Sequence, residues 1–123
     1  MKNRQARGLK AWTLGLRAET MAVWLLRFKG YRILARREKT PVGELDIVAR
    51  RGTVLAIVEV KARGTLQDAA EALTPRQRQR LERATEAFVA RRDDLAHLDI
   101  RFDLVLIAGG RATHVVDAWR PGL

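Results

Sequence analysis

The sequence predicts a single α/β domain in which helices flank a mixed central β-sheet. Three patterns predict this class: an apolar stripe at helical spacing in the first 30 residues, a pair of β-rich runs between Glu44 and Lys61, and a helix cap at Thr74. The expected order is one helix, three strands, a second helix and one or two closing strands. Because 123 residues is the usual length of one domain, we expect residues 1–123 to share one core.

The N-terminal part predicts a basic arm followed by an amphipathic helix. We expect residues 1–10, which carry four Lys or Arg side chains, to form a mobile arm. From about Leu9 to Lys29 the apolar residues recur at helical spacing, and Trp24 among them is expected to pack inside. Gly30 ends the helix, because glycine adopts the left-handed conformation of a C-terminal cap without strain. The expected buried stripe is Ala18, Met21, Ala22, Leu25 and Phe28.

Three strands are predicted next. Residues 31–36 alternate as in a strand, and residues 39–43, with a proline and a glycine, predict a turn. The runs Glu44–Arg50 and Thr53–Lys61 are rich in Val, Ile and Leu, which is typical of a β-hairpin. We expect the intervening Arg51-Gly52 to be a two-residue turn, which pairs the residues on either side of it.

A second helix begins at Thr74. Threonine caps helices, Pro75 suits the first helical turn, and Gln77 stands three residues after Thr74 as in a capping box. The buried side of this helix is expected to comprise Leu81, Ala84, Phe88 and Val89.

One or two closing strands are predicted at the C-terminal end. Two apolar runs, Phe102–Ala108 and Thr113–Trp119, resemble strands on either side of Gly109-Gly110. Residues 120–123 are expected to form a tail.

Composition excludes several classes of function. The chain has no cysteine, which rules out disulfides, thiolate nucleophiles, iron–sulfur clusters and Cys-ligated zinc. His97 and His114 are too few for a histidine-based metal centre, and both are expected at the surface. The uncharged runs are too short to cross a bilayer, and no apolar stretch of a signal peptide follows the basic start. We therefore expect a protein of the reducing cytoplasm with no membrane partner.

The charge predicts a polyanionic partner. The chain has 24 Lys or Arg against 14 Asp or Glu, a net charge of +10, and the first 40 residues hold eleven of the basic residues and two acids. Such asymmetry is typical of a surface that binds nucleic acid or an anionic membrane. Nucleic acid, here DNA, is the expected partner, because the apolar stripe of the first helix is expected in the core rather than in a membrane. On the second helix the arginines either contact phosphates or form a solvated face, and Gln77 either reaches the edge of the site or only caps the helix. The expected nucleic-acid-binding residues are Arg36, Arg37, Lys39, Arg63, Arg76, Gln77, Arg80 and Arg83, with Lys2, Arg4, Arg7 and Lys10 of the arm.

Two carboxylates stand in the most apolar part of the chain. In the expected hairpin register Asp46 lies opposite Ile57, so that Asp46, Glu59 and Lys61 share one face within diagonal reach. Carboxylates that close repel each other, and a divalent cation such as Mg²⁺ or Mn²⁺ removes the repulsion. Lys61 could then stabilise negative charge on a phosphate or orient the attacking water, as in phosphodiester hydrolysis. The alternative is a solvated polar face at the rim of a half-covered sheet.

Two further acids allow more than one role. Glu44 shares the face of Asp46 if the strand begins there, and it is either an additional metal ligand or an exposed acid at the strand end. Asp103 is expected to pair with Arg63 or Arg101 rather than to touch a metal.

These motifs together resemble the YraN family of uncharacterised bacterial proteins, over about residues 15–108. That family is similar to the PD-(D/E)xK nucleases, which implies a restriction-endonuclease-like core close to that of archaeal Holliday-junction resolvases. The matching segments are Gly43-Glu44-Leu45-Asp46, Val58-Glu59-Val60-Lys61-Ala62-Arg63, Arg101-Phe102-Asp103, and the opening Glu19, Ala22, Leu25, Gly30-Tyr31 and Ile33-Leu34.

The resemblance also implies roles for single residues. Two positions depart from the family pattern: Arg37 stands where Asn is expected, and Gln77 where Lys is usual. Neither departure replaces a metal ligand. The implied roles are the metal-binding aspartate for Asp46, the second acidic ligand for Glu59, the catalytic lysine for Lys61, and the first-helix glutamate that assists the metal site for Glu19.

Residues and resemblance together predict a metal-dependent endonuclease that cleaves DNA, including branched or otherwise structured DNA. The alternative is a nucleic-acid-binding module of the same fold that cuts nothing and acts in a repair or processing complex. A homodimer would suit a substrate with two-fold symmetry.

Overall fold

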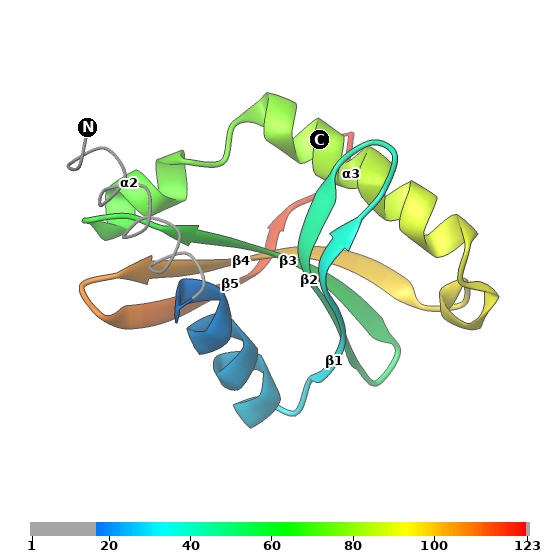
Figure 1. Cartoon of the computed structure of the whole chain (residues 1–123), viewed down its shortest axis with the longest axis horizontal. Helices are drawn as coiled ribbons and strands as arrows, with labels where there is room; N and C mark the ends of the chain where they lie inside the picture. Colours follow the sequence, from blue (N-terminus) through cyan, green and yellow to red (C-terminus); the bar gives the residue numbers. More distant parts are fainter. Residues whose placement is uncertain (1–16, 123) are drawn as a thin grey trace, which may run out of the picture.

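A computed structural model of the chain describes residues 17–122, which form a five-stranded sheet with helices on both faces (Figure 1). The sheet order is the chain order, and only the central β3–β4 pair is parallel, so the sheet is mixed as predicted. The basic arm expected at residues 1–10 lies outside the described residues. The strands are β1 (Arg32–Lys39), β2 (Glu44–Arg51), β3 (Val54–Ala62), β4 (Asp99–Ala108) and β5 (Arg111–Trp119).

The helices cover the two faces unequally. The first helix, seen over residues 17–28, lies on one face, and the helical segment between β3 and β4 covers the other (Figure 1). That segment is the crossover that a parallel pair requires. It comprises α2 (Leu66–Glu71), α3 (Pro75–Ala90) and the 3₁₀ turn η1 (Asp93–Leu95). The sequence did not predict α2, because a helix of six residues is too short to show a period. No helix within residues 17–122 combines the length and apolar character needed to span a membrane.

The first helix ends as predicted, at Gly30. Glycine there has φ +89°, and the amide of Tyr31 donates to the carbonyl of Leu26 at 2.9 Å, which is the Schellman pattern.

Replacing Gly30 by alanine is expected to lower the free energy of unfolding by about 1–2 kcal/mol, because a side chain is strained at this positive φ. Gly64→Ala is the matched control, since Gly64 has ordinary φ and nothing lies within 4 Å of an added Cβ. Urea denaturation of both variants measures the difference, and equal stability of the two would contradict the assigned cap.

The first helix turns a different face to the sheet than predicted. Ala18 and Ala22 are buried as expected, but Phe28 is 92% exposed and Trp24 is 63% exposed, so both were wrongly assigned to the core. The side that is buried carries Val23, Leu26 and the acid Glu19. The apolar residues of this helix form two overlapping stripes. The ion pairs of Glu19 with arginines of β1 determine which stripe faces the sheet.

The β2–β3 hairpin forms with a register that differs from the prediction. Gly52 and Thr53 make the turn, so Arg51 pairs with Val54 and Val48 pairs with Ile57. Gly52 has φ +61° at the first turn position, where a type II′ turn takes glycine. Because the pairing shifts by an even number of residues, the paired residues, 47–51 and 54–58, keep the faces that the sequence predicted.

The capped helix and the closing hairpin agree with the sequence. Thr74 and Gln77 form the reciprocal hydrogen bonds of a capping box at the start of α3. Between β4 and β5, both Gly109 (φ +57°) and Gly110 (φ +74°) adopt the left-handed conformation of a type I′ turn. Strand β4 begins at Asp99, three residues before its predicted start at Phe102.

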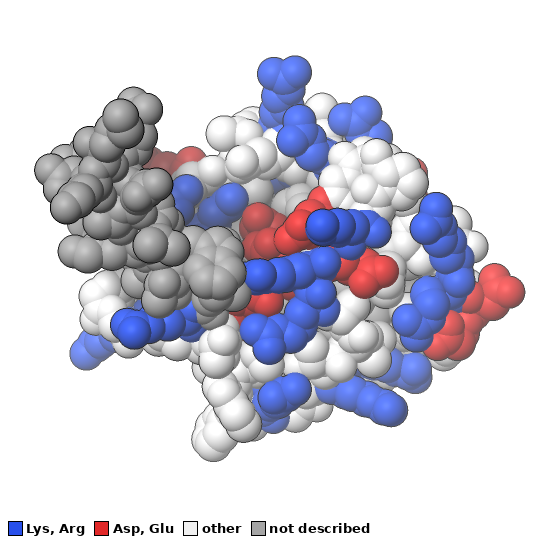
Figure 2. Space-filling model, in the orientation of Figure 1, with Lys and Arg blue, Asp and Glu red and all other residues white. Residues whose placement is uncertain are grey.

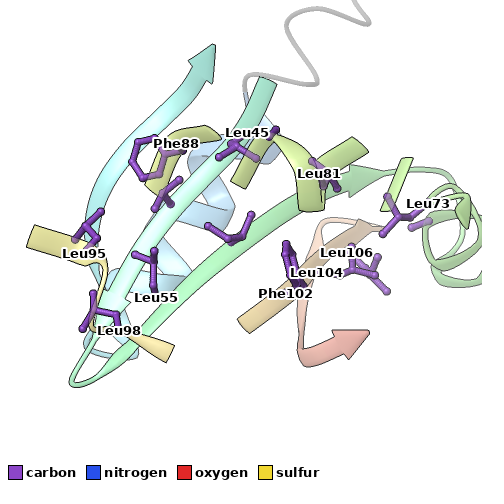
Figure 3. Close-up of a cluster of buried hydrophobic side chains, with 14 residues drawn as sticks. Leu45, Leu55, Leu73, Leu81, Phe88, Leu95, Leu98, Phe102, Leu104 and Leu106 are labelled. Atoms are coloured by element: carbon purple, nitrogen blue, oxygen red, sulfur yellow. The ribbon is translucent and has the colours of Figure 1, made fainter. Parts of the chain in front are cut away.

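One apolar core lies on each face of the sheet. Under α3, the helix side chains Leu81 and Phe88 pack with Leu45 of β2 in a leucine-rich cluster (Figure 3). Under the first helix a second cluster includes Leu26 and Val58. Strand β3 is therefore covered on both sides, and the acid near its end has to be satisfied inside the protein.

Candidate functional site

The two carboxylates of the apolar hairpin meet where the β2–β3 ladder ends. The last paired residues at this end are Ile47 and Val58, and Asp46 and Glu59 are the next residues on the two strands. The Oδ2 atom of Asp46 accepts a hydrogen bond of 2.9 Å from the amide of Val60. A side-chain oxygen thus bonds the β3 backbone at the position where the strands separate.

Lys61 completes this group. Its Nζ lies 3.4 Å from Oε1 of Glu59, and both side chains are only 14% exposed. The structure therefore brings together three of the residues that the sequence singled out, Asp46, Glu59 and Lys61. We call these three residues the acid–lysine group.

The environment opposes ionisation of both acids. Burial raises the pKa of Asp46, although the hydrogen bond from Val60 acts the other way. Burial, with the charge of Asp46, raises the pKa of Glu59 to about 8. At neutral pH Glu59 therefore keeps its proton in the metal-free protein.

This donor set fits a hard divalent cation. Oxygen ligands suit Mg²⁺ and Mn²⁺, and Mg²⁺ is usually held by one or two carboxylates with water and phosphate oxygens in the other positions. No cluster of three or more His, Asp or Glu residues with metal-site geometry occurs within residues 17–122. Asp46 and Glu59 would thus be the protein's acidic ligands. Because these two carboxylates are poorly solvated, their negative charge is poorly compensated, and a bound cation would offset it.

Glu19 lies near this group but is engaged with arginines. Its side chain is 9% exposed, with Oε1 3.1 Å from Nε of Arg36 and Oε2 2.8 Å from Nε of Arg37. The charge of Glu19 contributes to the raised pKa of Asp46, so Glu19 lies close enough to act on Asp46 electrostatically. The metal-assisting role that the resemblance implies for Glu19 stays a prediction.

Glu44 borders the group from the start of β2. It is exposed and pairs across the sheet with Lys39. The hydrogen bond that Arg37 donates to Glu19 and the charge of Glu19, with smaller contributions from the charges of Glu44 and Asp46, raise the pKa of Arg37. Arg37 therefore stands among three acids.

Basic side chains surround the acids. Figure 2 shows acidic side chains gathered in the middle of one face, with Lys and Arg side chains around them. Arg80 of α3 reaches this end of the molecule, because a Cβ on Gly43 would lie 3.2 Å from its Cγ. Arg63 is exposed at the end of β3, and Gln77 uses its side chain in the capping box. Arg76 and Arg83 are exposed on α3.

A second polar network, which the sequence predicted only in part, surrounds Asp103. This carboxylate is fully buried and accepts two hydrogen bonds of 2.8 Å from Arg101, the partner that the sequence predicted. It also accepts from the amide of Asp117 at 3.0 Å. Burial opposes its ionisation, but the hydrogen bonds from Arg101 and His114 outweigh burial and lower the pKa of Asp103.

His114 belongs to this network, and its predicted surface position is wrong. Its side chain is 1% exposed, with Nε2 2.8 Å from Asp103 and Nδ1 2.9 Å from Nζ of Lys29. Because an ammonium group only donates, Nδ1 accepts and Nε2 donates to Asp103. The signal that could have found it is the position of His114 in an apolar strand of a hairpin whose partner strand carries a buried acid. His97 is exposed as predicted.

Comparison with known proteins gives one family. A family model described as the uncharacterised protein family UPF0102 matches residues 18–107. A protein of Parvibaculum lavamentivorans is 60% identical over 121 residues, which cover 98% of this chain and 91% of that protein. One of Caulobacter vibrioides is 50% identical over 117 residues, or 94% of both chains. A third, of Paramagnetospirillum magneticum, is 55% identical over 108 residues, or 84% of both. The names of all three give the family and state no activity.

Proposed function

The chain belongs to UPF0102, the uncharacterised family that is also called YraN, and we propose from its own residues that it is a metal-dependent endonuclease acting on DNA. The observation that carries the proposal is the acid–lysine group. Two half-buried acids with raised pKa values stand on neighbouring strands beside an ammonium group.

Each member of the group has a role in phosphodiester hydrolysis. Asp46 and Glu59 would hold Mg²⁺ or Mn²⁺, and such an ion offsets phosphate charge and makes a bound water more acidic. The ammonium group of Lys61 stabilises the negative charge that grows on the phosphate oxygens in the transition state. Its contact with Glu59 keeps the ammonium group beside the proposed cation ligands.

The charge distribution supports a nucleic acid as the substrate. Exposed arginines at Arg63, Arg76, Arg80 and Arg83 contact phosphates without reading bases, so they suit a substrate recognised by its shape. The resemblance to resolvases favours branched DNA within this class. A homodimer and a location in the cytoplasm stay predictions.

Cleavage of labelled linear, nicked and four-way DNA with Mg²⁺ or Mn²⁺ tests the proposal. Asp46→Asn keeps an oxygen for the Val60 amide, and we expect it to cleave at least about 100-fold more slowly than the wild type, because a ligand charge is lost. Asp99→Asn is the matched control, since Asp99 is an exposed acid at the start of β4. Equal cleavage by the wild type and Asp46→Asn would overturn the proposal and identify a contaminating nuclease.

A second candidate function is DNA binding without cleavage. It is favoured by Glu19, whose two oxygens each contact an arginine. Calorimetry with Mn²⁺ distinguishes the two candidates. A wild type that binds no Mn²⁺ while its DNA affinity equals that of Asp46→Asn would support the binding module and contradict the nuclease.

A further inference from the structure

Glu19 contacts two guanidinium groups, each through its Nε atom. The carboxylate oxygens lie 3.1 Å from Nε of Arg36 and 2.8 Å from Nε of Arg37, and the carboxylate itself is buried. A guanidinium has five N–H donors, of which Nε–H is one, so each arginine keeps its four terminal donors for other acceptors. Both arginine side chains are 41% exposed. The arrangement therefore holds the two arginine side chains in place and leaves the terminal N–H groups of their guanidinium groups directed to solvent.

The backbone of β1 is distorted to allow this. Consecutive residues of a regular strand point to opposite faces, so Arg36 and Arg37 could not both reach one carboxylate. Arg37 has φ +50°, in the left-handed region that non-glycine residues seldom adopt. The distortion turns the two side chains to the same acid, and the surrounding ladder continues past it.

The distorted residue borders the acid–lysine group. Arg36 pairs with Ile47 and Glu38 pairs with Leu45, which places Arg37 opposite Asp46. The acids that act on Arg37 include Glu44 and Asp46. Two oriented guanidinium groups thus stand at the edge of the pair of acids proposed to hold the cation.

We propose that Glu19 is a positioning residue that holds Arg36 and Arg37 as a two-arginine clamp for a backbone phosphate of the nucleic acid. Arginine forks match the geometry of phosphate oxygens, and two forks held in place bind the group without loss of side-chain freedom. The inference rests on the proposed function: the clamp holds a phosphate next to the one that is cut, and it assigns Glu19 to arginine orientation in place of metal binding.

The test is DNA affinity in EDTA, where no cleavage occurs. Removing a negative charge by Glu19→Gln should strengthen binding to a polyanion if charge alone matters. The clamp requires the opposite, namely that Glu19→Gln binds DNA about fivefold or more weakly. The slope of the logarithm of the binding constant against the logarithm of the salt concentration should also be smaller by about 0.9 for each phosphate that the protein no longer contacts. Glu86→Gln removes the same charge from the exposed face of α3 and should bind as tightly as the wild type or more tightly.

Two further measurements separate the clamp from other roles. In an Arg36→Lys, Arg37→Lys background, which keeps both charges, Glu19→Gln should weaken binding no further, because the forks that it orients are gone. Mn²⁺ affinity by calorimetry should be the same for Glu19→Gln and the wild type.

The outcomes decide between the proposals. Unchanged or tighter DNA binding by Glu19→Gln, or a loss of Mn²⁺ affinity without loss of DNA affinity, would overturn the clamp. A wild type that binds DNA through the clamp but cleaves nothing would overturn the nuclease and support the clamp. Failure of the wild type to bind DNA would overturn both. Should Glu19→Gln not fold, the double lysine variant alone carries the test, with the same weakening expected.

Discussion

Replacement of Asp103 by alanine is expected to lower the free energy of unfolding by about 3–5 kcal/mol, because the side chains that donate hydrogen bonds to the carboxylate then stay inside the protein without their negatively charged acceptor. The carboxylate is 0% exposed and accepts from Arg101, His114 and the amide of Asp117. Its network also joins Lys29 at the end of the first helix to β5, through His114. A domain of this size has about 5–15 kcal/mol of stability, so the variant should be marginally folded at best.

Urea denaturation at pH 7 measures this effect. Asp99→Ala is the matched control: the same type of residue on the same strand, exposed, with an expected change within about 0.5 kcal/mol. A loss of less than about 1 kcal/mol in Asp103→Ala would show that the network contributes little, and the first helix would then be held by its apolar contacts and by the ion pairs of Glu19.

The metal-free protein is expected to lose stability as the pH rises from about 4.5 to about 8. Over this range Glu59 loses its proton in the unfolded chain, where its pKa is near 4.5, but keeps it in the folded protein up to about 8. The folded state therefore binds more protons, and stability falls with pH until Glu59 ionises in both states. The loss should be on the order of 5 kcal/mol, because the two pKa values differ by about 3.5 units. Asp46, whose pKa is also raised, acts in the same direction.

Urea denaturation in EDTA at pH 5, 7 and 8.5 measures this dependence. Glu59→Gln cannot ionise and should show a much flatter profile, whereas Glu86→Gln on the exposed face of α3 should follow the wild type. When Mn²⁺ replaces EDTA in the buffer, the stability of the wild type at pH 8.5 should rise again, because the ion binds the ionised acids of the folded state. Identical profiles for the wild type and Glu59→Gln would contradict the raised pKa.

Local signals were sufficient for much of the fold. The capping box at Thr74, the cap at Gly30 and the Gly109-Gly110 turn each depend on residues within a few positions of one another, and each forms as predicted. The same is true of the hairpin that carries Asp46, although its turn lies one residue further on. An even shift preserves the faces of a strand, so the expected meeting of the two acids did not depend on the turn being placed correctly.

The surroundings of the site were less accessible to sequence reasoning. The contacts of Glu19 with Arg36 and Arg37 join the first helix to a strand through a distorted residue that no local pattern marks. The departure from the family pattern at Arg37 falls at this residue, where the φ of +50° suits the expected asparagine better than arginine. The roles of the acid–lysine group and of the basic residues stay predictions.

By itself, the sequence determined the fold class, the order of most elements and the strands that carry Asp46, Glu59 and Lys61. Those features follow from periodicity and turn chemistry, which act over short stretches of chain. Only the tertiary structure decided which side of the first helix faces the sheet and that His114 is buried. Each of these depends on a polar partner distant in sequence, since a buried charge or ring nitrogen is stable only where its partner is already in place.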